Sequence, residues 1–525
     1  MMSTGKIIAR ATALILGLTL LSRFLGLGRE MAIAYRFGAT GTTDAFLVAF
    51  IIPYAFYSVV GMALTTAIVP VFAEYAAQGR REEAWRVLSL VVNAALVALA
   101  VAALFGVAGA PFIARALGGG FPPETLQLAT VLTATMMPSI VFMGLAGIFG
   151  GILNANNIFG PPACGPAAMN VSVILSALIV AAWFGVFGLA AGAVTGALIF
   201  ALVQVPALRH VGFRYSRVLS FRDPAVRQVL ALMWPVALTS GVGSVYMMID
   251  WRLASGLAEG SIAALNYANK LMQLPQGLFV LALTTAIFPT LSKLAAESRV
   301  GEMTAALQKG LKVILLLAVP GAVGLMVLRE PVVTLLFERG AFDARATAMS
   351  AEALLFYGVG LIGFCLNFPL TRGFFAMRDM RTPLLVLLST VVVKLFFNLL
   401  LVRFLAHAGL ALATSLTALV NMAVLAWLLE RRLPGLFDGS FFRLAGGVLA
   451  ASAAMGFIVH VLDGYLAAHL PGGSLALALR VGLDIACGAA VFAAAGLILR
   501  LDEPRYLLDL VRDLSRRWAG AAVSK

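Results

Sequence analysis

Three ionisable side chains interrupt an apolar stretch near the N-terminus. The string SRFLGLGRE at 22–30 carries Arg23, Arg29 and Glu30. Charged groups inside a membrane span are costly, so each is a functional candidate. A guanidinium stays charged and binds phosphate through paired hydrogen bonds, so two arginines in mid-span suit an anionic ligand. The alternative is a structural ion pair in which Glu30 neutralises one of them.

Two later segments add to this set. Asp44 lies in GTTDAF at 41–46, either as an acid at the positive end of a helix or as a functional group. Lys270 and Gln273 lie in LNYANKLMQLPQG at 265–277, just before the helix-breaking Pro275. Lys270 and the arginines of the first span predict a cationic cavity, whose expected ligand is a pyrophosphate.

A second polar set consists of Asp250, Lys394, Asn398 and Thr414. The Asp, Asn and Thr oxygens are suited to a small cation such as sodium. The Lys394 ammonium would compete for the same position, and we therefore favour a buried Lys394–Asp250 ion pair over an occupied sodium site. Asp484, deep in a later apolar stretch, has no evident role from the sequence.

The elements that hold these residues must lie in a membrane. Of 525 residues 61% are hydrophobic and 12% are charged, which excludes a soluble, disordered or coiled-coil chain. The net charge of +14 comes from short basic clusters between apolar spans, so nucleic-acid binding is disfavoured. Three scattered cysteines and the lack of metal-ligand, nucleophile or phosphate-loop motifs predict no metal, no cofactor and no catalysis.

Fourteen apolar stretches are each long enough to cross a bilayer as a helix. The predicted chain is therefore an all-α polytopic membrane protein with 14 transmembrane helices. Their approximate boundaries are 8–36, 44–76, 86–108, 125–153, 162–184, 187–207, 227–251, 261–290, 309–328, 347–371, 383–403, 408–430, 442–462 and 476–499.

The basic residues predict the orientation of these spans. Most Lys and Arg lie in the N-terminal segment, in the loops near 77–86, 208–227, 291–312, 372–382 and 431–443, and in the tail. The opposite side has only Arg115, Arg252, Arg329, Arg339, Arg345 and Arg403. The positive-inside rule then places both termini in the cytoplasm. The tail from Arg500 to Lys525 is expected to be an amphipathic helix on the membrane surface.

An internal repeat divides the chain. ALTTAIVP at 63–70 returns as ALTTAIFP at 282–289, and the tripeptide GLA at 188–190 returns at 409–411. Spans 1–6 and 7–12 thus form two six-helix lobes related in parallel, which favours a transporter with its site between the lobes over a duplicated scaffold. The predicted domains are 1–215, 216–435, the appended helices at 436–500 and the tail at 501–525.

Several motifs give the chain a family resemblance. SRFLGLGREMAIAYRFGATGTTDAFLVAF at 22–50 and IVPVFAEY at 68–75 resemble the opening of the MurJ/MviN family. NYANKLMQLPQGLF, IFPTLSK, LFERGAFD and GFFAMRDMRTP follow in the family's order. These proteins are flippases of lipid II, the lipid-linked peptidoglycan precursor, in the multidrug/oligosaccharidyl-lipid/polysaccharide exporter superfamily.

The resemblance implies alternating access around a central cavity in the bacterial inner membrane, with a groove near spans 13 and 14 for the lipid tail. By position, Arg23, Arg29 and Lys270 match cavity cations, whereas Glu30 and Asp44 match acids of the motif. Asp250, Asn398 and Thr414 approximate a sodium site of some members. Two departures stand out: residues 54–58 lack the family's second-span arginine, and Lys270 and Gln273 replace the usual Arg and Glu.

The sequence supports one mechanism and leaves alternatives. The headgroup would enter an inward-open cavity, bind the cations and be released outside as the lobes rock, helped by an inside-negative membrane potential. The departures leave another polyprenyl-pyrophosphate-linked oligosaccharide as an alternative cargo. A drug/cation antiporter of the same superfamily and a membrane-embedded glycosyl- or phosphotransferase are further alternatives. One chain suffices for such a cavity, so a monomer surrounded by bilayer lipids is expected.

Overall fold

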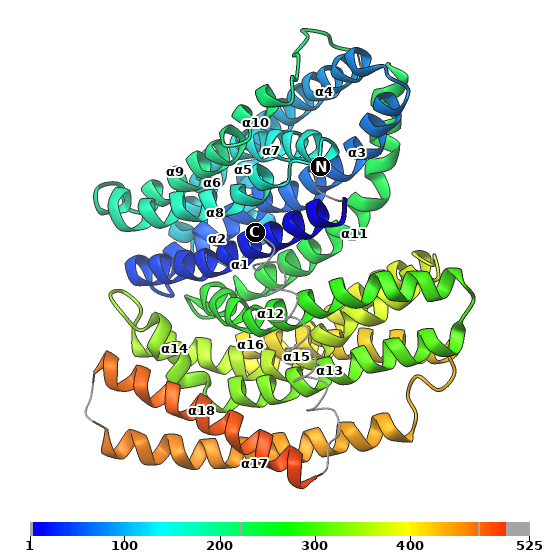
Figure 1. Ribbon diagram of the computed structural model, residues 1–525. Helices are drawn as coiled ribbons and strands as arrows, with labels where there is room; N and C mark the ends of the chain where they lie inside the picture. Colours follow the sequence, from blue (N-terminus) through cyan, green and yellow to red (C-terminus); the bar gives the residue numbers. More distant parts are fainter. Residues whose placement is uncertain (1–3, 221, 471–472, 500–525) are drawn as a thin grey trace. The chain divides into compact units, whose positions relative to one another are not determined.

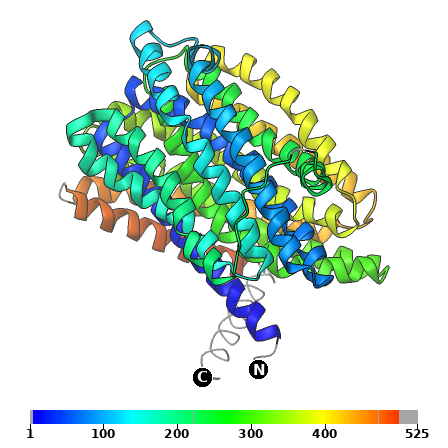
Figure 2. The ribbon, with the colours of Figure 1, turned by 90° about the horizontal axis from the view of Figure 1, so that it is seen from above.

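The computed structural model describes residues 4–220, 222–470 and 473–499, within which every regular element is a helix. The chain divides into two compact units. Figures 1 and 2 show its helices from two directions. Unit 1 comprises residues 1–264 and 338–346, and unit 2 comprises 265–337 and 347–525. The predicted C-terminal tail lies outside the described residues.

Unit 1 contains the helices of the first half of the chain. They are α1 (Thr4–Phe37), α2 (Gly41–Phe56), η1 (Tyr57–Gly61), α3 (Met62–Ala77), α4 (Arg81–Ala108), α5 (Ala110–Gly118), α6 (Pro123–Met136), α7 (Ser139–Ala155), α8 (Gly160–Leu175), η2 (Ser176–Val180), α9 (Ala181–Leu202), α10 (Val205–His210) and α11 (Pro224–Ala254).

Helix α12 (Ser261–Ala296) begins at the end of unit 1 and continues into unit 2. The other helices of unit 2 are α13 (Val300–Val327), α14 (Arg329–Phe337), α15 (Ala344–Ala376), α16 (Arg381–Glu430), α17 (Gly439–His469) and α18 (Ser474–Ile498).

The predicted apolar spans coincide with these helices. Among the described residues, eight continuous helices are long and apolar enough to cross a membrane, and two bent pairs, α6 with α7 and the two halves of α11, raise the number to ten. Two of the eight, residues 160–210 and 381–430, each contain two predicted spans. The predicted spans 8–36 and 261–290 correspond to α1 and α12, of 34 and 36 residues.

The helical stretches at 160–210 and 381–430 each reverse direction at one residue. Gly185 has φ 54° and ψ −140°, and Ala406 has φ 46° and ψ −127°. The chain folds back there, so that Ser172 Oγ donates to the carbonyl oxygen of Gly192 at 3.1 Å. In unit 2 the Lys394 ammonium donates to Thr414 Oγ1 at 2.6 Å across the corresponding turn. Each stretch is therefore a helical hairpin and supplies two spans.

Positive φ angles recur at matching places in the two halves of the chain. Five pairs of residues with this rare backbone conformation are separated by 219 to 223 residues, close to the offset of the sequence repeat. The pairs are Gly38 and Gly260, Gly79 and Ser298, Asn157 and Arg378, Gly185 and Ala406, and Gly212 and Gly435. Corresponding helices thus end in the same kind of turn, which supports the duplication inferred from the sequence.

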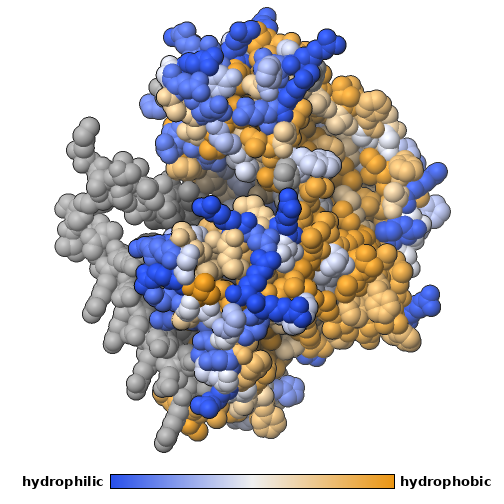
Figure 3. Space-filling model, turned by 90° about the vertical axis from the view of Figure 1, so that its right-hand side faces the viewer, coloured by the Kyte–Doolittle hydropathy of each residue, from blue (hydrophilic) through white to orange (hydrophobic). Residues whose placement is uncertain are grey.

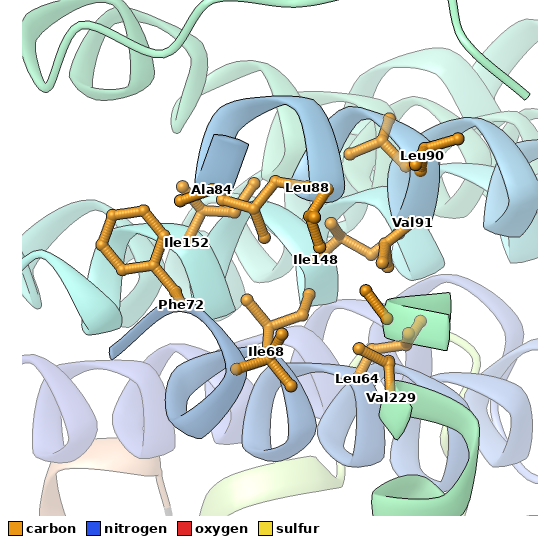
Figure 4. Close-up of a cluster of buried hydrophobic side chains, with 14 of the residues drawn as sticks. Leu64, Ile68, Phe72, Ala84, Leu88, Leu90, Val91, Ile148, Ile152 and Val229 are labelled. Atoms are coloured by element: carbon orange, nitrogen blue, oxygen red, sulfur yellow. The ribbon is translucent and has the colours of Figure 1, made fainter. Parts of the chain in front are cut away.

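A cluster of buried apolar side chains holds α3, α4, α7 and α11 together in unit 1. Ile68 and Leu64 on α3 meet Leu88 on α4, Ile148 on α7 and Val229 on α11 (Figure 4). Within a bilayer such contacts stabilise through close packing rather than removal from water. Helix α11, predicted as the first span of the second copy, thus packs in unit 1.

Small residues allow the closest approaches in this packing. A Cβ atom on Gly147 of α7 would lie 2.5 Å from the carbonyl oxygen of Gly61. Thr65 Oγ1 donates to the carbonyl oxygens of both glycines, at 2.9 Å to Gly61 and 2.7 Å to Gly147. The short π-helix η1 lies at this contact, and such π-helical turns are often found at functional sites.

Apolar side chains cover much of the visible surface (Figure 3). Large hydrophobic residues such as Phe105, Trp183, Phe404 and Leu475 are more than two thirds exposed. So many exposed apolar side chains are a liability in water but suit contact with lipid tails. The surface therefore agrees with the membrane location that the composition predicts.

Candidate functional site

Arg29 on α1 is held in place inside unit 1. Its Nη2 contacts Glu30 Oε1 at 2.5 Å, and its Nη1 donates to Asn170 Oδ1 on α8 at 3.3 Å. Asn170 Nδ2 in turn donates to the carbonyl oxygen of Ser22 at 3.1 Å, which ties α8 to α1. Glu30 is only 1% exposed. Glu30 is therefore an ion-pair partner of Arg29.

The Arg29 guanidinium retains hydrogen-bonding capacity beyond these contacts. Its Nε is buried and has no acceptor among the described residues. Its side chain is 17% exposed, and its guanidinium carbon lies 6.0 Å from the centre of the Phe50 ring on α2. A guanidinium carries five N–H donors, so Glu30 and Asn170 leave donors for an incoming anion. Arg29 is thus positioned, charged and incompletely satisfied.

Arg23 and Arg36 lie on the same helix in different settings. Six residues turn an α-helix by about 600°, so Arg23 and Arg29 project roughly 120° apart. Arg23 is partly buried, whereas Arg36 is exposed and donates to the carbonyl oxygen of Ala181 at 3.3 Å. Arg36 thus behaves as expected for a residue near a span end.

Asp44 on α2 binds the beginning of another helix. Its Oδ2 accepts from the backbone N–H of Gly260 at 2.9 Å and its Oδ1 from that of Ala263 at 2.8 Å. These are donors at the start of α12, so Asp44 caps a helix 216 residues away in sequence. Glu259 Oε1 accepts from the backbone N–H of Gly41, at the start of α2, at 2.7 Å. Asp44, in the first turn of α2, thus caps α12, and Glu259, just before α12, caps α2.

The segment 338–346 joins this capping arrangement within unit 1. Ala341 donates its backbone N–H to the carbonyl oxygen of Tyr35 at 2.8 Å, and Arg345 Nη2 donates to that of Glu259 at 2.9 Å. Gly340 has φ 63°, and a Cβ there would lie 2.3 Å from the Tyr35 carbonyl oxygen. Both Asp44 oxygens are therefore used in a backbone network, which gives Asp44 an architectural role.

Lys270 and Gln273 lie on the part of α12 that belongs to unit 2. Both are partly buried, and Gln273 Nε2 donates to Asn269 Oδ1 at 2.5 Å. Arg23 and Arg29 belong to unit 1. The cationic cavity expected from the sequence therefore stays a prediction.

The second predicted polar set is also divided between the units. Lys394 and Asn398 on α16 are both 0% exposed, and Thr414, which receives a hydrogen bond from Lys394, donates to the Leu410 carbonyl oxygen at 2.9 Å. Asp250, on α11, belongs to unit 1. The Lys394–Asp250 pair and the sodium site both stay predictions. Among the described residues there is no group of three or more His, Cys, Asp or Glu side chains fit for a metal ion.

Sequence reasoning missed Asn170 and the pairing of Asp463 with Arg480. Asn170 lies in an apolar span, and no charged or repeated motif in the sequence singles it out. Arg480 Nε donates to Asp463 Oδ1 at 2.6 Å, so these two side chains form an ion pair. Two features of the sequence could have indicated these contacts. One is an uncharged polar residue within a span, and the other is a pair of opposite charges near the ends of adjoining spans.

The fold is shared with solved structures of membrane transporters. A solved structure described as an inward-facing MATE family multidrug transporter of the MOP superfamily matches with a TM-score of 0.66 at 14% identity, over 82% of this chain and 99% of that chain. A structure of lipid II flippase MurJ in an inward closed conformation matches with a TM-score of 0.80 at 24% identity, over 93% of this chain and 99% of that one. At these identities the matches establish the fold.

The sequence comparisons establish the family. The model described as "Lipid II flippase MurJ" matches residues 33–479. The lipid II flippase MurJ of Burkholderia cenocepacia is 35% identical over 464 residues, covering 85% of this chain and 89% of the relative. A probable lipid II flippase MurJ of Buchnera aphidicola is 31% identical over 78% of this chain and 80% of its own length. The chain belongs to the lipid II flippase MurJ family, whose members are transporters rather than enzymes.

Proposed function

We propose that this protein moves lipid II across the bacterial cytoplasmic membrane, from the inner to the outer leaflet. The observation that carries the proposal is the family match over residues 33–479, joined to 35% identity with a named lipid II flippase. The buried, incompletely satisfied Arg29 supports it independently, because lipid II carries a pyrophosphate that a guanidinium can bind through paired hydrogen bonds.

In the proposed mechanism Arg29 receives the pyrophosphate. Glu30 and Asn170 hold one contact at each of its two Nη atoms and leave further Nη N–H groups for the ligand. Arg23 and Lys270 contribute further positive charge, while Gln273 and Asp44 belong to the segments that position these cations. Lys270 provides a compact charge without the planar fork of an arginine, which makes Arg29 the more geometrically demanding contact.

The lobes then exchange access between the two sides of the membrane. In parallel-repeat transporters such a change is largely a rocking of one bundle against the other around a fixed site. An anionic headgroup that moves outward is favoured by an inside-negative potential by about 2.3 kcal/mol per charge per 100 mV, if it crosses unneutralised. The membrane potential thus supplies the driving force, and the Lys394 ammonium would compete with sodium for the second polar set.

The proposal extends to the oligomeric state of the protein, its orientation in the membrane and the path of the lipid tail. The protein acts as a monomer in the inner membrane with both termini in the cytoplasm, as the distribution of basic residues predicts. Helices α17 and α18 provide the surface along which the polyprenyl chain stays in lipid while the headgroup crosses.

Complementation of a bacterial strain depleted of its own lipid II flippase tests this function. Wild type should restore growth, and Arg29→Ala and Lys270→Ala should not. Arg36→Ala and Lys293→Ala serve as matched controls, since Arg36 is an exposed arginine on the same helix as Arg29 and the Lys293 side chain is 74% exposed. Both controls should restore growth.

Loss of the ion-pair partner must be separated from loss of binding. Arg29→Ala leaves the buried Glu30 carboxylate without this cation, which can destabilise a protein by about 3–5 kcal/mol. The double variant Arg29→Gln/Glu30→Gln removes both charges and should insert normally while failing to complement. Growth supported by a well-inserted double variant would contradict the proposed role of Arg29.

Failure of well-inserted wild type would point to another cargo. The second span of this chain has Tyr54 to Ser58 where many relatives carry an arginine, so this cavity has one cation fewer. A different polyprenyl-pyrophosphate-linked oligosaccharide then becomes the candidate substrate.

A further inference from the structure

The appended helices contain a buried acid that the transport mechanism does not use. Asp484 on α18 is 0% exposed, and both of its carboxyl oxygens lack a hydrogen-bond partner in the described part of the chain. A carboxylate buried without donors costs several kcal/mol, so such groups are normally paired or neutralised. Asp484 therefore requires an explanation.

The nearest cation is already engaged by a second acid. Arg480 lies one helical turn before Asp484, and its Nε donates to Asp463 Oδ1 on α17 at 2.6 Å. The Asp463 carboxyl group also lies beside that of Asp484. Two ionised carboxylates have no hydrogen to share, whereas one added proton turns the pair into a donor and an acceptor.

The other side of Asp484 is apolar. One turn further along α18, a Cβ atom on Gly488 would lie 3.2 Å from Val459 and 3.6 Å from Met455 on α17. Val459 and Met455 pack with Leu328 in a buried cluster between these helices. The neighbouring turn of α18 therefore packs against apolar side chains.

The two charged residues at the start of the neighbouring α14 make contacts other than with Asp484. Glu330 is exposed and acts electrostatically on Arg480, and Arg329 Nη1 donates to the carbonyl oxygen of Met326 at 2.7 Å. Asp463, Arg480 and Asp484 thus form a triad of two acids and one base, with Glu330 at its edge.

We infer that Asp484 and Asp463 form a proton-binding site in the appended helix pair. A proton from water adds to a carboxyl oxygen of Asp484, and the resulting O–H donates to the Asp463 carboxylate, which keeps its ion pair with Arg480. No other bond forms or breaks. The triad changes from a net charge of −1 to neutral, and the partly exposed Asp463 connects it to solvent at the predicted extracytoplasmic end.

A proton fits this site better than a metal ion. Sodium, calcium and magnesium require several oxygen ligands, whereas this site offers two carboxyl groups, one of them already paired with Arg480. The inference concerns the charge state of the protein itself and does not depend on which lipid it transports.

Infrared spectroscopy of the full-length protein in lipid nanodiscs tests the inference. At mildly acidic pH the wild type should show the carbonyl stretch of a protonated carboxylic acid, which disappears on titration to high pH. Asp484→Asn should lack this band, and Asp484→Glu should retain it at a shifted frequency. Glu330→Gln is the matched control, because it removes a nearby but exposed carboxylate, and it should keep the wild-type band.

Three outcomes would overturn the inference. The band could persist unchanged in well-folded Asp484→Asn, or it could be absent from the wild type at all pH values. It could also be lost when N-methylglucamine is exchanged for sodium at constant pH and ionic strength, which would make this a cation site. Asp463→Asn should weaken the titration and destabilise the protein, since it leaves Arg480 without its acid.

Discussion

The two hairpin turns predict opposite effects of exchanging glycine and alanine. Gly185 and Ala406 occupy matching places in the repeat with similar dihedral angles, φ 54° and ψ −140° against φ 46° and ψ −127°. These angles belong to the first central position of a type II′ turn, which favours glycine. An alanine in such a conformation costs about 1–3 kcal/mol.

Gly185→Ala isolates this backbone cost. A Cβ atom at this position meets no neighbouring atom within 4 Å, so no steric clash contributes. We expect the free energy of unfolding to fall by about 1–3 kcal/mol. Ala406→Gly should raise it by about 1 kcal/mol, because relief of strain exceeds the roughly 0.4–1 kcal/mol that glycine adds to the entropy of the unfolded chain.

Unfolding by SDS titration in mixed micelles, followed by circular dichroism, measures both changes. Gly482→Ala is the control: Gly482 lies within α18 with no atom near its Cβ position, and alanine there should be neutral or stabilising. The reasoning would be refuted if Ala406→Gly lowered the free energy of unfolding. It would also be refuted if Gly185→Ala changed that free energy no more than Gly482→Ala does.

Three further predictions concern single side chains. Asp44→Ala should destabilise the protein by about 1–3 kcal/mol in thermal unfolding, because it leaves backbone N–H donors at the start of α12 unpaired; no change would contradict the capping role. Lys394→Met should be strongly destabilising and should be rescued by adding Asp250→Asn if these residues form the predicted ion pair; a double variant no more stable than the single one would exclude the pair. Hydrogen bonds from Thr382, together with Arg432, lower the pKa of Asp379 to about 2, so its contribution is complete above pH 3.8 and is lost as the pH falls toward 2. Asp379→Asn should therefore lower stability at pH 7, by at most about 1 kcal/mol because the pair is near solvent, and the difference from wild type should shrink in acid.

Much of the fold was predictable because the membrane imposes one rule. Every backbone polar group in the bilayer must be paired within its own segment, so an apolar stretch of sufficient length must be a helix. The stretches at 86–108 and 442–462 accordingly lie within α4 and α17. The reversal at Ala406 was not evident from its residue type, since alanine has no preference for such a turn. The gap between the predicted spans 383–403 and 408–430 located the reversal, and alignment with Gly185 identifies Ala406 as the turning residue.

The contacts of the candidate residues were harder to predict than their positions. The charge of Arg29 inside a span singled it out, but Asn170 lies 141 residues away and only packing brings α8 beside α1. Asp44 was recognised as a possible cap, yet the helix it caps begins 216 residues later. Such partners depend on which helices are neighbours in space, which the order of apolar spans does not specify.

Translocation of lipid II by the purified protein tests the central claim most directly. Proteoliposomes with lipid II in both leaflets would be treated with an impermeant enzyme that modifies only the outward-facing headgroups. Wild type and Arg36→Ala should expose the inner pool to modification, whereas Arg29→Gln/Glu30→Gln should leave it protected. Protection of the inner pool by correctly folded wild type, with exposure of a different polyprenyl-linked oligosaccharide under the same conditions, would contradict the account.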